Sequence, residues 1–231
     1  MFPNTIAFIP DGNRRYAKKA GISCAEAYAL GTKRAWDVID WMKDYPKIKA
    51  GTFYTLSLEN LSRNKIELNV LFRLFERELD LVKQKGIFEE QGIKLKFIGR
   101  LNGLPKRLQE KISAVEKHTS EFGGRQINLA IGYNGQAEIV DAAKRFAKDC
   151  EKGDAKVEGL DETKFSEYLY STSRPDLIVR TGGTQRLSGF LTYQSAYSEL
   201  YFSDKYWPEF EKEDLNAAIL EFGERERRFG K

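Results

Sequence analysis

Histidine and cysteine are nearly absent from this chain of 231 residues, which contains only His118, Cys24 and Cys150. The two cysteines are far apart and match no metal-binding spacing, so a zinc site of cysteine and histidine is excluded. Long apolar runs are also missing. No stretch approaches the ~20 residues of a membrane-spanning helix, and the start of the chain lacks the pattern of a signal peptide. These absences predict a cytoplasmic protein whose association with a membrane, if any, is peripheral.

Charge of one sign is also scarce, because the net charge is only +4. Basic and acidic residues alternate, as they do in the segment 224–228, whereas nucleic-acid-binding proteins cluster their basic residues on one face. We therefore expect no nucleic-acid partner. Apolar residues make up 41% of the chain, enough for a sizeable core, and the length suits a single domain over residues 1–231.

Short apolar runs alternate with longer segments of helical periodicity. Continuous apolar runs are typical of strands that are buried on both faces of a parallel sheet. The pattern predicts an α/β fold with a central, mostly parallel sheet flanked by helices. The expected strands are Thr5–Ile9, Thr52–Leu56, Lys94–Ile98, Gln126–Ile131, Asp176–Val179 and Glu199–Phe202. The expected helices are Ala25–Met42, Lys65–Lys85, Pro105–Glu121, Gln136–Lys148, Asp161–Tyr170 and Glu213–Phe229, and Cys150–Gly159 is expected to be a surface loop.

The first candidate site follows the first expected strand, where the sequence reads Asp11-Gly12-Asn13-Arg14-Arg15. A turn that leads into a helix presents unpaired backbone N–H groups, which favour an anion such as phosphate. Arginine side chains add charge-assisted hydrogen bonds. A carboxylate at Asp11 would repel phosphate unless a magnesium ion lay between them. The alternative interpretation is that Asp-Gly-Asn is simply a favourable turn sequence.

The second candidate site follows the expected strand that ends at Val179. Arg180, the Gly182–Gly183 turn, Arg186 and Ser188 place two guanidinium groups and a hydroxyl around one loop. That combination suits a diphosphate, which offers many acceptor oxygens. The loop does not match the Gly-x-x-x-x-Gly-Lys-Ser/Thr motif of nucleotide-binding proteins. The alternative is a glycine-rich turn with solvated arginines.

Two further features leave alternatives open. Polar residues gather in Ser57–Arg63, directly after an expected strand, but Ser62 and Asn64 could equally cap the next helix. On that helix, Phe72, Phe75 and Leu79 recur at helical spacing. This spacing is typical of packed core, although a hydrophobic substrate tunnel would require the same residue types.

Taken together, these stretches resemble the motifs of the cis-prenyltransferases, the undecaprenyl diphosphate synthase family. The resemblance covers essentially the whole chain, in order and with few changes of length. It rests on Ile6–Ala17, Ser57–Arg63, Asn128–Asn134, Asp176–Ser188, Ala196–Phe202, Trp207–Pro208 and Arg225–Gly230.

The resemblance implies a homodimeric α/β enzyme that uses magnesium to condense an allylic diphosphate with isopentenyl diphosphate and forms a cis double bond. No insertion extends 65–101, which indicates a short- or medium-chain product. By position, Asp11 and Glu199 would hold the metal, and Asp11 and Asn60 would lie at the reacting groups. The allylic diphosphate would contact Gly12, Asn13, Arg14, Arg15 and Tyr16, and isopentenyl diphosphate would contact Arg63, Arg180, Arg186 and Ser188.

Some positions depart from the pattern of the family. Cys24 replaces an arginine that contacts the allylic diphosphate, Tyr28 replaces a histidine and Tyr16 replaces a tryptophan. An irregular condensation, with dimethylallyl diphosphate as acceptor, is therefore an alternative. A non-catalytic subunit of a heteromeric prenyltransferase is less favoured, because such subunits usually lack the equivalent of Asp11. A nucleotide-binding module would need a phosphate motif that the chain does not have.

Overall fold

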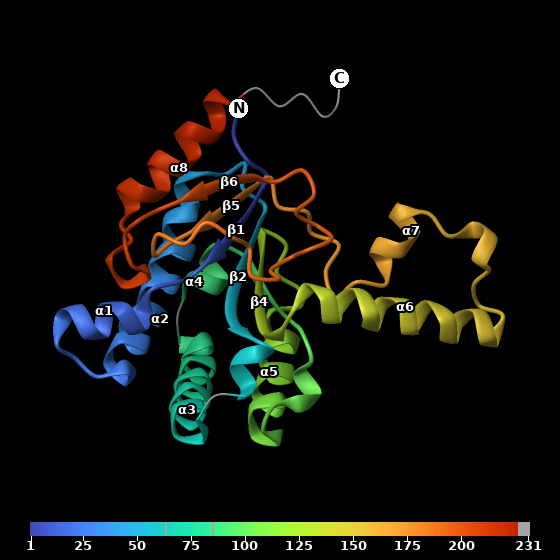
Figure 1. The fold of residues 1–231 in the computed structure, drawn as a ribbon, viewed down its shortest axis with the longest axis horizontal. Helices are drawn as coiled ribbons and strands as arrows, with labels where there is room; N and C mark the ends of the chain where they lie inside the picture. The colour runs from blue at the N-terminus through green and yellow to red at the C-terminus, as the bar shows by residue number, and fades with distance from the viewer. Residues whose placement is uncertain (63, 85, 226–231) are drawn as a thin grey trace.

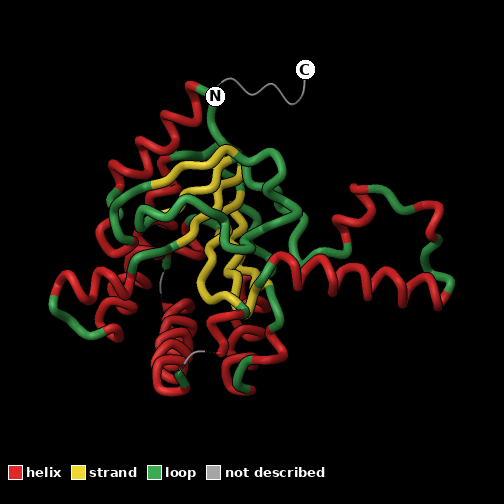
Figure 2. The backbone as a smooth tube through the Cα atoms, in the orientation of Figure 1, coloured by secondary structure: helices red, strands yellow, loops and turns green. Residues whose placement is uncertain are grey.

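Six parallel strands form one sheet in the computed structural model, which describes residues 1–62, 64–84 and 86–225. The strand order is β3-β4-β2-β1-β5-β6, and every pairing is parallel. The strands lie at the centre of the fold with helices around them (Figure 2). The strands are β1 (Thr5–Ile9), β2 (Ala50–Ser57), β3 (Ile93–Ile98), β4 (Arg125–Tyr133), β5 (Leu177–Arg180) and β6 (Glu199–Phe202). Each overlaps an expected strand, with ends that differ by at most two residues, so the predicted fold class is confirmed.

The helices follow the expected order with shifted ends. They are α1 (Asn13–Ala20), α2 (Cys24–Trp41), α3 (Lys65–Leu81), α4 (Ile87–Glu90), α5 (Lys106–Thr119), α6 (Gly135–Lys152), α7 (Glu162–Glu167) and α8 (Lys212–Glu224). Helix α1 and the short α4 were not among the expected helices. The expected loop at Cys150–Gly159 is corrected in part, because α6 continues to Lys152, where Gly153 caps it with a φ of 83°. Residues 85 and 226–229 of two expected helices lie outside the described residues.

Local hydrogen bonds explain where several helices begin. Ser23 and Glu26 form a reciprocal capping box at the start of α2. The Asn64 side chain accepts a hydrogen bond from the Ile66 backbone N–H at 2.8 Å, so Asn64 is the cap of α3. The alternative that the sequence left open for this residue, a helix cap, is therefore correct.

The sheet is buried on both faces, and alternate residues of each strand enter different apolar clusters. Ile6 and Phe8 of β1 belong to the larger cluster, which α2, α3, α5 and α8 cover. Ala7 and Ile9 belong to a smaller cluster with Phe190 on the opposite face. Helix α6 extends away from the sheet with α7 beside it (Figure 1). Among the described residues, we find no helix that combines the length and apolarity needed to cross a bilayer.

Candidate active site

The two predicted anion-binding stretches meet at the carboxyl edge of the sheet. Strands β1 and β5 are neighbours, and Ile9 is paired in register with Arg180. The segments that leave these strands are joined by Thr181, whose hydroxyl donates to the Asp11 carbonyl oxygen at 2.8 Å. The Asp11 backbone N–H also lies 3.0 Å from that hydroxyl oxygen. The parallel register therefore brings together residues that are about 170 positions apart, and it fixes them to the rigid part of the fold.

Asp11 lies at the centre of this edge. One carboxylate oxygen accepts from the Gly12 N–H at 2.6 Å and lies 3.1 Å from Arg15 Nη2, and the other accepts from Arg180 Nη2 at 2.9 Å. Burial opposes the charge of Asp11, but the hydrogen bond and charge of Arg180, followed by those of Arg15 and Gly12, outweigh it and lower the pKa below its ordinary value. The carboxyl group is consequently ionised at neutral pH.

Helix α1 begins directly after this aspartate. Its N-cap residue, Gly12, has a φ of 102°, and a β-carbon there would lie 2.7 Å from Tyr206 Cδ1. Only glycine suits both the conformation and the close approach. No side chain caps the helix, so the first backbone N–H groups of α1 are available to an anion. Asn13, Arg14 and Tyr16 lie on this first turn, and the Arg14 side chain is exposed.

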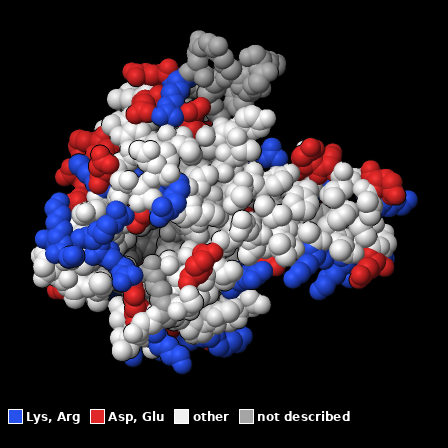
Figure 3. Space-filling view, in the orientation of Figure 1, with Lys and Arg blue, Asp and Glu red and all other residues white. Residues whose placement is uncertain are grey.

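Arg15 links the two stretches from the α1 side. Its Nη1 donates to the Gly182 carbonyl oxygen at 2.6 Å, and its guanidinium lies 5.4 Å from the centre of the Tyr206 ring. Lys19 Nζ lies 5.7 Å from the centre of the same ring. These residues belong to a basic surface over α1, next to a hollow in the molecular surface (Figure 3). Sequence reasoning missed Tyr206, although Trp207–Pro208, one of the stretches that carry the family resemblance, directly follows it.

Arg180 carries the second stretch. It is only 5% exposed, and its Nη1 donates to Ser188 Oγ at 2.8 Å and to the Arg186 carbonyl oxygen. Its Nε is buried and, among the described residues, has no hydrogen-bond partner, although it is a strong donor. The Arg186 side chain and Ser188 lie at the surface of the same loop. Arg180, Arg186 and Ser188 are thus brought together as the sequence predicted.

A buried carboxylate anchors the loop that carries Ser188. Glu138 of α6 is fully buried and accepts from the Tyr170 backbone N–H at 2.8 Å and from Gln194 Nε2 at 3.1 Å. The Gly189 carbonyl oxygen of the same loop accepts from the N–H of the first residue of α6 at 2.7 Å. Ser188 itself has a φ of 51°, which is uncommon for a residue other than glycine. The anchors hold this backbone conformation at the edge of the site.

The predicted site residues that remain are Asn60, Arg63 and Glu199. Asn60 is half-buried in a short 3₁₀ turn after β2, where its N–H donates to Ser57 Oγ at 3.2 Å. Arg63 lies outside the described residues. Glu199 is the first residue of β6 and is in register with Leu177. It therefore lies at the amino end of the strands, about 10 Å from Arg180 along the strand direction. It accepts from Arg225 Nη1 at 2.8 Å.

The expectation that Glu199 joins Asp11 at one metal is therefore not met within a single chain. Parallel strands place their first residues at one edge of the sheet and their last residues at the other. Groups of three or more acidic, histidine or cysteine side chains that could hold a metal are absent from the described part of the chain. Asp11 is the predicted metal ligand that lies at the carboxyl edge, between two arginines.

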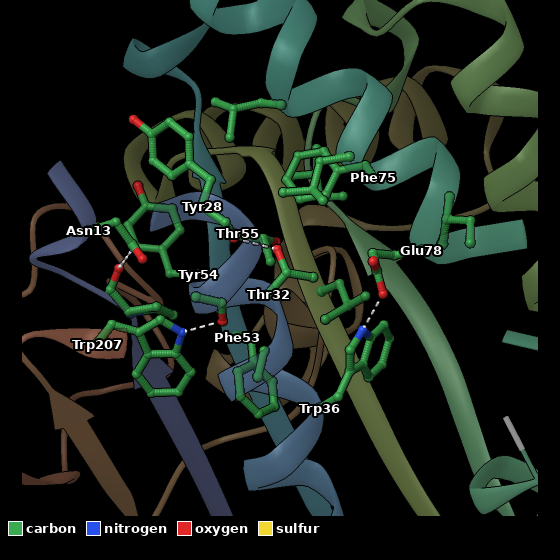
Figure 4. A pocket seen from close by; sticks show the side chains of 18 of the residues that line it. Asn13, Tyr28, Thr32, Trp36, Phe53, Tyr54, Thr55, Phe75, Glu78 and Trp207 are labelled. Atoms are coloured by element: carbon green, nitrogen blue, oxygen red, sulfur yellow. Dashed lines mark hydrogen bonds between the residues drawn. The ribbon is translucent and has the colours of Figure 1, made fainter. Parts of the chain in front are cut away.

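An apolar cavity opens beside the start of α1. Including the part that is open to solvent, it has about 850 Å³ of space, and it is lined chiefly by residues of α2, α3, β2 and β4 (Figure 4). Phe75 and Leu79 line it, Leu79 also belongs to the core cluster, and Phe72 and Phe75 pack against that cluster, so the core interpretation of their spacing is confirmed and the substrate tunnel stays a prediction. Asn13 and Pro10 line the end next to Asp11. The cavity thus begins where the anion-binding edge ends.

Comparisons with known proteins match this geometry. Residues 9–230 match a family model described as putative undecaprenyl diphosphate synthase. A tritrans,polycis-undecaprenyl-diphosphate synthase (geranylgeranyl-diphosphate specific) from Thermoplasma acidophilum is 45% identical over 99% of this chain and 89% of its own length. The protein of the same name from Pyrobaculum aerophilum is 42% identical over 99% and 96%, respectively.

Two solved structures are also similar. Lavandulyl diphosphate synthase from Lavandula x intermedia, in complex with dimethylallyl diphosphate, superposes with a TM-score of 0.94 and 33% identity, covering 100% of this chain and 99% of that one. A probable undecaprenyl diphosphate synthase from Campylobacter jejuni gives a TM-score of 0.82 and 33% identity, with 99% of both chains covered. This chain therefore belongs to the undecaprenyl diphosphate synthase family, the cis-prenyltransferases.

Proposed function

We propose that this cis-prenyltransferase extends geranylgeranyl diphosphate with isopentenyl diphosphate, one five-carbon unit at a time, to a cis-prenyl diphosphate. The observation that supports this most directly is the junction of two anion-binding stretches with one apolar cavity at Asp11 and Asn13. The relatives from Thermoplasma and Pyrobaculum carry that primer in their names. The cavity also suits a primer with a long hydrocarbon chain better than one with five carbons.

The two arginine-containing stretches would bind different substrates. Arg180, Arg186 and Ser188 would hold the diphosphate of isopentenyl diphosphate, with the unpaired Arg180 Nε as a further donor. The N-terminus of α1 and the Arg15 side chain would bind the allylic diphosphate. As the allylic carbon–oxygen bond breaks, negative charge develops on the departing diphosphate, and preorganised donors at α1 stabilise it. Binding both substrates at one edge also orients the two reacting carbons.

Asp11 fits a magnesium ion that one carboxylate shares with substrate phosphates, the usual arrangement for this metal. When bound, magnesium would supply positive charge for the departing diphosphate. Asp11 is suited to it because its pKa is lowered, so the carboxylate needs no proton loss to bind. We place Asn60 near the reacting groups as a hydrogen-bonding residue. Glu199 would reach such a metal only from a second copy of the chain, which is in keeping with the homodimer that we infer.

Product analysis by mass spectrometry tests this proposal. The protein is incubated with magnesium and dimethylallyl, geranyl, farnesyl or geranylgeranyl diphosphate, each with and without isopentenyl diphosphate. We expect products that grow by five-carbon units only when isopentenyl diphosphate is present, with geranylgeranyl diphosphate as the preferred primer. Products from dimethylallyl diphosphate alone would instead establish the irregular condensation. No product under any condition would refute catalysis by this chain alone.

A further inference from the structure

The positive charge of the chain is concentrated in one stretch, 13–34, which forms α1, the turn after it and the first part of α2. These 22 residues contain six basic residues and one acidic residue, so the stretch carries a charge of +5. The other 209 residues contain 32 basic and 33 acidic residues and have a net charge of −1. The small net charge of the whole chain therefore hides a local excess, which is visible as a group of Lys and Arg side chains over α1 (Figure 3).

Four of these basic residues share the outer face of α1. They follow the spacing of one helix face, all four are exposed, and they are Arg14, Arg15, Lys18 and Lys19. Arg15 belongs to the active site, and Lys19 Nζ lies 2.6 Å from a carboxylate oxygen of Glu209. Arg14 and Lys18 form no ion pair with any residue that the structure describes. Exposed cations without a partner attract an anionic surface.

Apolar side chains adjoin the basic face of α1. Ile22 lies in the turn between α1 and α2, and on the outer side of α2 it neighbours Leu30, which is 42% exposed, and the exposed Lys33. The one acidic residue of the stretch, Glu26, is engaged by the start of its own helix, because its carboxylate accepts from the Ser23 N–H at 2.9 Å. A surface that combines lysine and arginine with exposed aliphatic side chains is typical of segments that lie at the surface of a bilayer.

We propose that α1 and the beginning of α2 dock onto a bilayer that contains anionic lipids. Lys18 and Lys33 contact the lipid headgroups, and Ile22 and Leu30 enter the boundary between headgroups and acyl chains. A nucleic acid would require only the charge, so the exposed leucine is what favours a bilayer as the partner.

The purpose of this docking surface, though not its existence, rests on the proposed function. That function yields a product with a long hydrocarbon chain, which dissolves in a bilayer and not in water. The basic face belongs to the same helix whose first turn lies at the active site. Docking through this face therefore brings the active site close to the membrane that receives the product.

Sedimentation of the whole protein with lipid vesicles tests the proposal. Vesicles of phosphatidylcholine and phosphatidylglycerol should bind the protein, vesicles of phosphatidylcholine alone should bind it about tenfold more weakly, and added salt should weaken the binding. One lysine near an anionic membrane changes the affinity about fivefold, so the double variant Lys18→Gln, Lys33→Gln should bind ~25-fold more weakly. Neither lysine belongs to the active site, and the rate of prenyl transfer measured without vesicles should not change.

The double variant Lys144→Gln, Lys148→Gln is the matched control. Both residues are exposed lysines of α6, and this variant loses the same net charge. Helix α6 leaves the fold on the side opposite to α1 (Figure 1). The control should bind anionic vesicles as tightly as the unaltered protein. Equal weakening in the two double variants, or unchanged binding in the variant of Lys18 and Lys33, would overturn the proposal.

Two further measurements separate a bilayer from other anions. Leu30→Ser keeps every charge of the surface, and we expect it to weaken vesicle binding about tenfold without affecting binding to a DNA duplex. If the protein binds the duplex as tightly as the vesicles, and Leu30→Ser alters neither affinity, the surface is a general polyanion site and the proposal is wrong. Inorganic diphosphate in excess occupies the active site, so vesicle binding that it abolishes would also overturn the proposal.

Failure of the docking surface is distinguishable from failure of the proposed function, because vesicle binding needs neither substrate nor turnover. A protein that extends geranylgeranyl diphosphate but does not bind anionic vesicles retains the proposed function and refutes the docking surface. A protein that binds these vesicles through Lys18 and Lys33 but makes no product refutes the proposed function and supports the docking surface.

Discussion

Replacing Asp11 by asparagine isolates the charge of the residue at the centre of the site, since the side chain keeps its size. The asparagine side chain would still accept from the Gly12 N–H with its oxygen. Its amide NH₂, however, would face Arg180 Nη2, which donates to the carboxylate at 2.9 Å in the native protein. Two donors would then oppose each other. The loss of one charged hydrogen bond costs ~1.5–3 kcal/mol.

The catalytic rate of Asp11→Asn should fall by at least as much as its binding of substrate weakens. Without the carboxylate, Arg180 loses the partner that orients it, and magnesium would lose the protein ligand that we propose for it. Removing one preorganised electrostatic group typically lowers kcat ~10²–10³-fold, and we expect a decrease of that order for Asp11→Asn. The assay is the initial rate of incorporation of labelled isopentenyl diphosphate into geranylgeranyl diphosphate, at several magnesium concentrations.

Asp161→Asn is a suitable control, because Asp161 caps α7 and asparagine is an equally good N-cap. The control should retain full activity and an unaltered midpoint of thermal unfolding. If Asp11→Asn is folded and works within about threefold of the native rate, a difference under ~1 kcal/mol, the central role given to the Asp11 charge is wrong.

Three further predictions concern charge and stability. Cys24→Arg should tighten binding of the allylic diphosphate ~10-fold or more by adding a charged contact, and an unchanged dissociation constant would contradict that account. Arg125→Met should reduce the free energy of unfolding in urea by about 3 kcal/mol. The reason is that the buried guanidinium donates to the carbonyl oxygens of Ile48 and Met42 at 2.7 and 2.8 Å. A loss under ~1 kcal/mol would contradict this prediction. Because the folded-state pKa of Asp11 is below its ordinary value of 3.8, its stabilising contribution should be present above pH 3.8 and be lost as the pH falls through the lower value. Acid unfolding of Asp11→Asn should lack this component, and identical acid transitions would refute it.

The sequence predicted most of the fold because its signals are local. Each strand is a short apolar run, and the alternation of strands and helices dictates a parallel sheet. The prediction that both anion-binding stretches lie at carboxyl ends follows from the same pattern, and the register of Ile9 with Arg180 confirms it. The ends of α3 and α6 were less predictable, since helix ends depend on single capping residues such as Gly153.

The placement of Glu199 was deducible from the sequence but was overlooked. The expected strand Glu199–Phe202 already makes this residue the first of its strand. In a parallel sheet the first residues lie at the amino edge, whereas the candidate site is at the carboxyl edge. A role inferred from resemblance alone therefore conflicts with the geometry of one chain, and the conflict is removed only if a partner chain supplies the residue.

Tyr206 shows what no local pattern could have revealed. It lies more than 190 positions from Gly12, in the segment between β6 and α8, and the adjacent Trp207–Pro208 motif does not indicate a contact with Gly12. Tyr206 nevertheless explains why position 12 is glycine, because a β-carbon there would clash with the Tyr206 ring. It also supplies the aromatic face beside Arg15. The adjacent Trp207 N–H donates to the Asp11 carbonyl oxygen at 3.0 Å, so this segment is tied to the first turn by its backbone as well. The anion-binding edge is thus held in place by a late segment of the chain, and its preorganisation depends on the whole sheet being folded.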